Sequence, residues 1–158
     1  MASVELQSFR IRFGYELDRL LETIADLDDE AVNWKPPVPS ANSLLVLVTH
    51  ALASAEEHVV GKAAGKTVVR NRDAEFATTG GSGHLAARAA EVRRRIDEAL
   101  AGLEGRLDEE RDPPIDKWPS GARGTVRDRL IHSVSHTAEH VGHAQLTRDL
   151  YNASRGSR

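Results

Sequence analysis

Cysteine is absent from this chain of 158 residues, and aromatic residues make up only 4% of it. The lack of cysteine excludes disulfides, thiolate metal ligands and a cysteine nucleophile, so any thiol chemistry needs a thiol supplied from outside. The sequence has no strand pattern and no internal repeat. It also lacks an apolar run that approaches the ~20 residues of a membrane span.

Excess positive charge is missing as well. The formal net charge of −3 argues against a dedicated nucleic-acid-binding protein. A local basic cluster at residues 93–95 is surrounded by acidic side chains, and we interpret it as a solvated helix face. Residues 1–5 lack the basic and apolar regions of a signal peptide. We therefore expect a cytoplasmic protein whose partner is a small molecule, with no nucleic acid and no membrane.

The remaining composition is that of a soluble globular protein. Apolar residues account for 40% of the chain and charged residues for 28%, which makes wholesale disorder improbable. A chain of this length can bury a core of its own without disulfides or metal ions. We expect residues 1–158 to form one domain.

Apolar residues recur at steps of three and four along most of the chain, which is the period of amphipathic helices. A short turn at 31–34 precedes a proline-rich extended stretch, and residues 152–158 are expected to fray. The fold class is therefore all-α: a four-helix bundle with long loops between the second and third and the third and fourth helices. The predicted helices span residues 6–27, 44–64, 85–107 and 125–151.

Four of the seven histidines lie close together near the C-terminal end of the chain, at His132, His136, His140 and His143. In a helix these spacings place all four rings within an arc of about 80°. Imidazole is the commonest protein ligand for zinc and nickel, and two histidines one turn apart can point at one ion. His136 and His140 form such a pair. The alternative interpretation is that this histidine face is a polar stripe exposed to solvent.

A third ligand normally comes from a different element of the fold. His50 is a lone ionisable residue in an apolar segment of the second predicted helix, where an unpaired imidazole is costly to bury. An ordinary hydrogen bond would satisfy it. In a bundle, however, it can also face His136 and His140, and we predict a three-histidine metal site with these residues.

Several short motifs, in this order, resemble the DinB/YfiT-like superfamily. They are a Trp-x-Pro-Pro turn at 34–37, Asn42-Ser43 at the start of the second helix, His50 seven residues later, and a closing His-x-x-x-His-x-Gly at 136–142. The stretch 70–76 resembles a loop of actinobacterial members. The resemblance covers nearly the whole chain.

This resemblance implies a four-helix bundle, often a homodimer, that holds a divalent metal ion through His50, His136 and His140. Characterised branches use the ion, commonly zinc, to activate a low-molecular-weight thiol such as mycothiol or bacillithiol for S-transfer or isomerisation. The isomerase-like branch prefers glutamate at the position of His136, which argues against maleylpyruvate isomerase activity. His143 stands where glutamine is common and, like His132, is interpreted as a group beside the metal ligands.

Three functions follow from this sequence. The first is a metal-dependent thiol S-transferase with zinc or nickel on the three histidines. The second is a non-catalytic bundle whose ion ties two helices together, and the third is a metal-dependent hydrolase. The substrate is not specified by the sequence, and a homodimer is expected from the resemblance alone.

Overall fold

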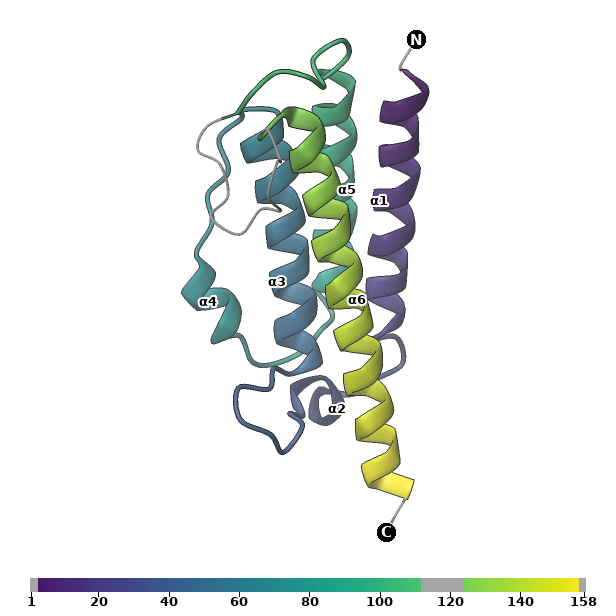
Figure 1. Cartoon of the computed structure of the whole chain (residues 1–158). Helices are drawn as coiled ribbons and strands as arrows, with labels where there is room; N and C mark the ends of the chain where they lie inside the picture. Colours follow the sequence, from purple (N-terminus) through teal and green to yellow (C-terminus); the bar gives the residue numbers. More distant parts are fainter. Residues whose placement is uncertain (1–2, 112–123, 157–158) are drawn as a thin grey trace.

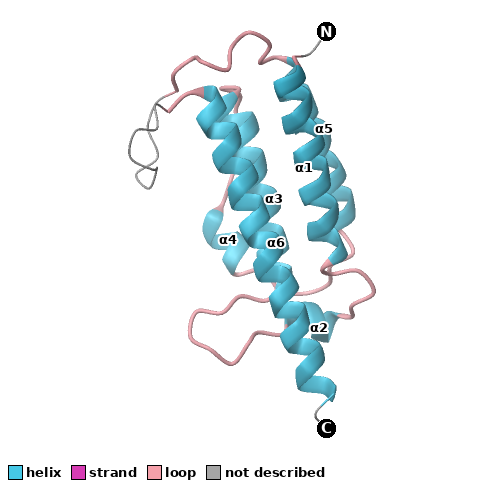
Figure 2. Ribbon diagram, turned by 45° about the vertical axis from the view of Figure 1, so that its right-hand side comes forward, coloured by secondary structure: helices cyan, strands magenta, loops and turns pink. Residues whose placement is uncertain are grey.

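The computed structural model describes residues 3–111 and 124–156, and in that part of the chain the regular elements are helices (Figure 2). The all-α prediction is confirmed. The elements are α1 (Val4–Glu22), α2 (Asp29–Asn33), α3 (Leu44–Glu56), the π-helix η1 (Glu57–Ala63), α4 (Arg72–Phe76), α5 (Leu85–Ala101) and α6 (Val126–Gly156).

Four long helices form the bundle (Figure 1). α1 and α6 run in one direction, and α3 with its continuation η1 and α5 run in the other. Each long helix packs mainly against two others, so that the order around the bundle is α1, α6, α3 and α5, with a smaller contact between α1 and α3. Because α3 and α5 are parallel, the chain between them must return along the bundle, and this return segment carries α4 beside α3 (Figure 1).

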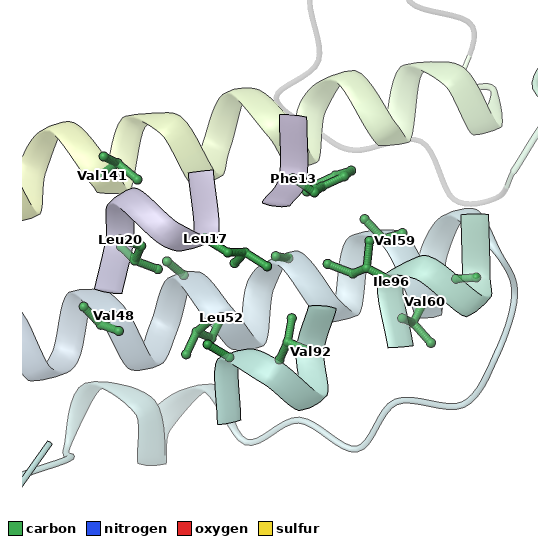
Figure 3. Packing of buried hydrophobic residues seen from close by; sticks show 14 of the residues in the cluster. Phe13, Leu17, Leu20, Val48, Leu52, Val59, Val60, Val92, Ile96 and Val141 are labelled. Carbon is green, nitrogen blue, oxygen red and sulfur yellow. The ribbon is translucent and has the colours of Figure 1, made fainter. Parts of the chain in front are cut away.

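The bundle is held by one hydrophobic core to which all four long helices contribute (Figure 3). Phe13, Leu17 and Leu20 recur at steps of four and three on α1, and all are at most 1% exposed. Leu52 of α3 is fully buried at the centre. These are the positions that the helical period assigned to an apolar face.

α3 is the central helix. Eleven of its thirteen residues are buried, which explains its nearly continuous apolar sequence. By length and composition, Leu44–Ala63 is a candidate membrane span, contrary to the expectation that no apolar run reaches that length. Since 72% of this segment is buried inside the bundle, its apolar character is accounted for by the core.

Local signals explain where α3 and its continuation begin and end. The Ser43 side chain accepts a hydrogen bond from the backbone N–H of Val46 and caps the N-terminus. Gly65 adopts φ +72°, a left-handed conformation that favours glycine, and turns the chain out of η1. The sequence predicted this helix well but did not indicate that its last turns are π-helical.

Other expectations need correction. The first and third long helices end at Glu22 and Ala101, before the predicted ends at residues 27 and 107. The tail was expected to fray after Tyr151, but α6 continues to Gly156, since Tyr151 packs edge-on against Trp34 at a ring separation of 5.7 Å. The return segment was expected to be irregular, yet it contains α4. The second long loop lies largely outside the described residues, as does Trp118. That residues 1–158 form a single domain stays a prediction.

Replacing Leu52 by alanine tests the central role of α3. The substitution leaves a cavity in a fully buried position, so the free energy of unfolding is expected to fall by about 2–5 kcal/mol. Ile11→Ala is the control, because that side chain is 66% exposed and its loss is expected to change stability by about 0.5 kcal/mol or less. Urea denaturation followed by circular dichroism measures both. Equal effects would contradict the assigned core.

Candidate metal centre

Histidines from α3, η1 and α6 meet along one seam of the bundle. Because α3 and α6 are antiparallel, side chains spaced by multiples of four residues along one helix lie opposite side chains with the same spacing on the other. His50 faces His140, with ring centroids 4.9 Å apart. Eight residues further along, His58 faces His132 at 4.8 Å. The seam therefore has a histidine pair at each end and His136 between them.

His50, His136 and His140 converge on one point. The ring centroids of His136 and His140 are 4.5 Å apart, and those of His50 and His136 are 5.7 Å apart. Each residue offers a nitrogen within 4.8 Å of the nitrogens of the other two. In the part of the chain that the structure describes, this is the group of three side chains placed to share an ion. It consists of the three histidines that the sequence predicted.

The hydrogen bonds around these rings suit metal ligands. His50 Nδ1 lies 2.8 Å from Glu75 Oε2. An ionised carboxylate can only accept, so Nδ1 carries the proton and Nε2 is left with a free lone pair. The Nδ1 of His140 is buried and has no hydrogen-bond partner among the described residues. Such an orphaned nitrogen is costly unless something binds it, and a metal ion would.

Burial keeps the three imidazoles neutral. Desolvation, reinforced by neighbouring histidines, lowers the pKa of His136 to about 4 and that of His140 to about 3. Burial also lowers the pKa of His50, although the hydrogen bond to Glu75 opposes this. Neutral imidazole is the form that binds metal ions, so no proton has to leave these rings at neutral pH.

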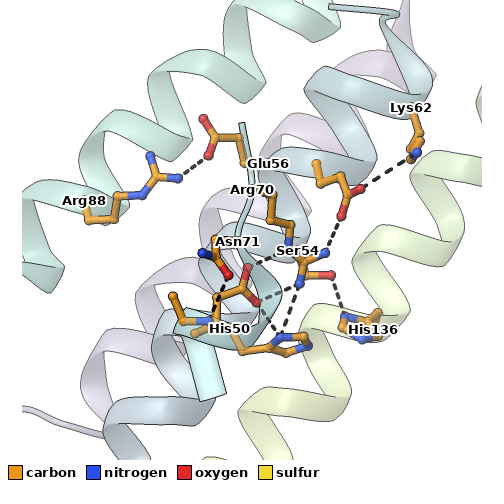
Figure 4. A network of polar contacts seen from close by, with 11 residues as sticks. His50, Ser54, Glu56, Lys62, Arg70, Asn71, Arg88 and His136 are labelled. Carbon is orange, nitrogen blue, oxygen red and sulfur yellow. Dashed lines mark hydrogen bonds and ion pairs between the residues drawn. The ribbon is translucent and has the colours of Figure 1, made fainter. Parts of the chain in front are cut away.

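α4 covers the His50 side of the site. Asn71 caps this helix by accepting from the backbone N–H of Ala74 at 3.0 Å. The Phe76 ring lies 4.8 Å from the His50 ring. Arg70 holds both Glu75 oxygens, with Nε–Oε1 and Nη2–Oε2 distances of 2.6 and 2.8 Å, and it also pairs with Glu57 of η1 (Figure 4).

Arg70 and Glu75 were missed as site residues by the sequence reasoning. The sequence carried one signal, because both lie in the 70–76 motif that resembles a loop of the superfamily. Periodicity could not place that loop against α3. Burial raises the pKa of Glu75, but the hydrogen bonds from Arg70 and His50 outweigh it, and the pKa lies below its usual range. This carboxylate is therefore ionised beside the site.

The other histidines lie outside this group of three. His132 is half-buried and makes an edge-on ring contact with His58; it is not one of the three converging histidines. His143 is exposed, with its ring centroid 5.8 Å from that of His140. His84 is exposed at the start of α5. The roles predicted for His132 and His143 beside the ligands stay predictions.

The fold and the site together define a helical bundle with a candidate three-histidine metal centre. Comparison with family models gives a match to the mycothiol S-transferase family over residues 11–153. The chain belongs to that family, which confirms the resemblance to the DinB/YfiT-like superfamily. A comparison with curated proteins gave no match. The family is one of transferase-like enzymes that act on small molecules.

The half-buried histidines of the seam predict that the metal-free protein loses stability below neutral pH. In the folded chain the pKa values of His58 and His136 are about 4, against 6.5 for an ordinary histidine. The unfolded chain therefore binds protons first, so stability is full above pH 6.5 and decreases as pH falls toward 4. The loss by pH 5 is expected to be about 1 kcal/mol or more.

Urea denaturation at pH 7, 6 and 5 with a chelator present measures this loss. Most carboxylates titrate below pH 5, so a change in stability between pH 7 and pH 5 comes mainly from the histidines. His58→Gln, which removes one of the buried imidazoles, is expected to flatten the pH dependence. An identical slope in the variant and the wild type would contradict the assignment.

Proposed function

We propose that this protein is a metal-dependent S-transferase that uses mycothiol, with a divalent ion held by His50, His136 and His140. Zinc and nickel are among the ions that imidazole donors suit, and they are the ions that we propose. The observation that carries the proposal is the convergence of three neutral histidines, one buried and two half-buried, in a chain of this family. Bacillithiol is the alternative thiol from the sequence resemblance, and the family match favours mycothiol.

A divalent ion on three neutral histidines keeps its full charge, acts as a Lewis acid, and lowers the pKa of a thiol or water at its open position. The chain contains no cysteine that could take that position. In S-transfer, the thiol sulfur forms a bond to an electrophilic carbon while the bond from that carbon to its leaving group breaks. The thiol proton is released to solvent, and no oxidant or reductant is needed.

The residues of the chain supply the scaffold for this chemistry. α6 fixes two ligands one turn apart, and α3 supplies the third from the opposite side. His136 Nδ1 lies 3.4 Å from the Ser54 hydroxyl, which restrains that ring (Figure 4). We also propose that the protein is cytoplasmic and forms a homodimer, as the sequence and the resemblance predict.

Metal content tests the ligand assignment. Elemental analysis of untagged protein purified without chelator is expected to find about one zinc or nickel ion per chain, because the three histidines form one site. His50→Ala and His136→Ala are expected to lose it with helix content near that of the wild type. His132→Ala, one turn from His136 on the same helix, is the matched control and is expected to keep the ion. Full metal content in His50→Ala would contradict the site.

Turnover tests the reaction. The metal-loaded protein is expected to accelerate the reaction of mycothiol with a fluorogenic alkylating electrophile, and His136→Ala is expected to react at the uncatalysed rate. Bacillithiol and glutathione in parallel reactions measure thiol specificity. Hydrolysis of ester substrates without any thiol would instead favour the hydrolase. A bound ion that raises the melting temperature, with no turnover of any substrate tried, would favour the structural role.

A further inference from the structure

One ligand of the proposed centre differs from the other two in its surroundings. His50 donates through Nδ1 to a carboxylate oxygen of Glu75 at 2.8 Å. His136 has only the Ser54 hydroxyl, 3.4 Å from its Nδ1, and no hydrogen bond in the described residues joins His140 to a charged side chain. Of the three proposed ligands, His50 of α3 is therefore the one that has a hydrogen bond to a charged side chain among the described residues.

The contact between His50 and Glu75 is built into the fold rather than made by a surface side chain. Both residues are 6% exposed, although Glu75 lies on a helix of only five residues. Arg70 grips the two carboxylate oxygens with two parallel hydrogen bonds, which is the geometry that arginine and carboxylate groups prefer. Glu57 in turn binds Arg70 from η1. The carboxylate is thus fixed from two sides.

We propose that Glu75 is a positioning residue for His50. It fixes the tautomer with the proton on Nδ1, orients Nε2 toward the ion, and makes Nε2 a stronger metal ligand. The proposal rests on the three-histidine site proposed above. Histidine ligands that donate their other N–H to a carboxylate bind metal more tightly, and loss of such a partner typically weakens metal binding by about 10–100-fold.

Arg70 has a supporting role in the same arrangement. Its Nη2 lies 3.3 Å from His50 Nδ1, so without Glu75 the guanidinium would be left facing the imidazole. That arrangement would favour an Nδ1 that accepts, which moves the ring proton to Nε2 and removes the lone pair that the ion needs. Glu75 therefore decides which of the two ring nitrogens is available.

The decisive variant is Glu75→Gln, which keeps the size of the side chain and removes its charge. Zinc affinity, measured in competition with a chromophoric chelator, is expected to weaken by about 10–100-fold. The cobalt(II) absorption spectrum is expected to change, because the donor strength of one ligand changes. Neither quantity requires turnover, and neither is expected to change if Glu75 only stabilises the fold.

Glu56→Gln is the matched control. Glu56 is a buried carboxylate of α3, 2% exposed, that pairs with Arg88 and Arg95 of α5. It has the chemistry and burial of Glu75 without a contact to a histidine ligand in the described structure. We expect this variant to lower the melting temperature and to keep zinc affinity within about twofold of the wild type, because the ion-pair partners of Glu56 are Arg88 and Arg95 rather than a ligand histidine.

A double-mutant cycle separates positioning from a general effect. In a His50→Ala background, Glu75→Gln is expected to cause no further loss of the residual affinity, because the group on which it acts is gone. Unchanged affinity in Glu75→Gln, equal weakening in Glu56→Gln, or additive losses in the cycle would each overturn the proposal. If Glu75→Gln fails to fold, Arg70→Lys is used, which keeps the charge but loses the paired geometry, and it is expected to weaken zinc binding.

Failure of this proposal is distinguishable from failure of the proposed function. Full zinc content in His50→Ala would refute the ligand set itself. Normal zinc binding in Glu75→Gln, with the ion lost in His50→Ala, would refute only the positioning role.

Discussion

The antiparallel packing of α3 on α6 is the constraint on which the rest of this structure depends. With α3 and α6 both advancing 3.6 residues per turn, side chains four residues apart stay near the same seam, and His58 follows directly after the end of α3, in the first turn of η1. His50 and His58 of the α3 side therefore meet His140 and His132 of α6 in register. A shift of one residue in either helix would rotate its histidines by about 100° and separate the ligands.

The core and the candidate site share the same helices but place opposite demands on them. α3 is buried on nearly all sides, so any polar side chain it carries needs a partner within the protein. His50 obtains one from Glu75, and Glu56 obtains two from Arg88 and Arg95. Burial also keeps the imidazoles neutral, so the same desolvation that is costly for a charged group prepares these rings to bind a cation.

The two sides of the site are supported differently. His136 and His140 belong to a helix of thirty-one residues that packs against α1 and α3. His50 is oriented through α4, a helix of five residues held by the Asn71 cap and the Arg70 pairs. The precision of the His50 side thus depends on a few charge-assisted hydrogen bonds rather than on extensive apolar packing. A buried carboxylate gripped by arginine can supply that precision in a short segment.

The sequence by itself determined the four long helices and their core faces, because a period of 3.6 residues can be recognised from neighbouring positions, and it predicted the three histidines that lie together in the structure. Phe13, Leu17 and Leu52 lie in the core as their spacing predicts. Only the tertiary structure decided the helix directions, the π-helical end of α3, and the pairing of Glu75 with His50 across twenty-five positions. Such contacts depend on how a return segment docks on a helix formed earlier in the chain. No local period encodes that docking, which follows from the burial and charge of residues far apart in the sequence.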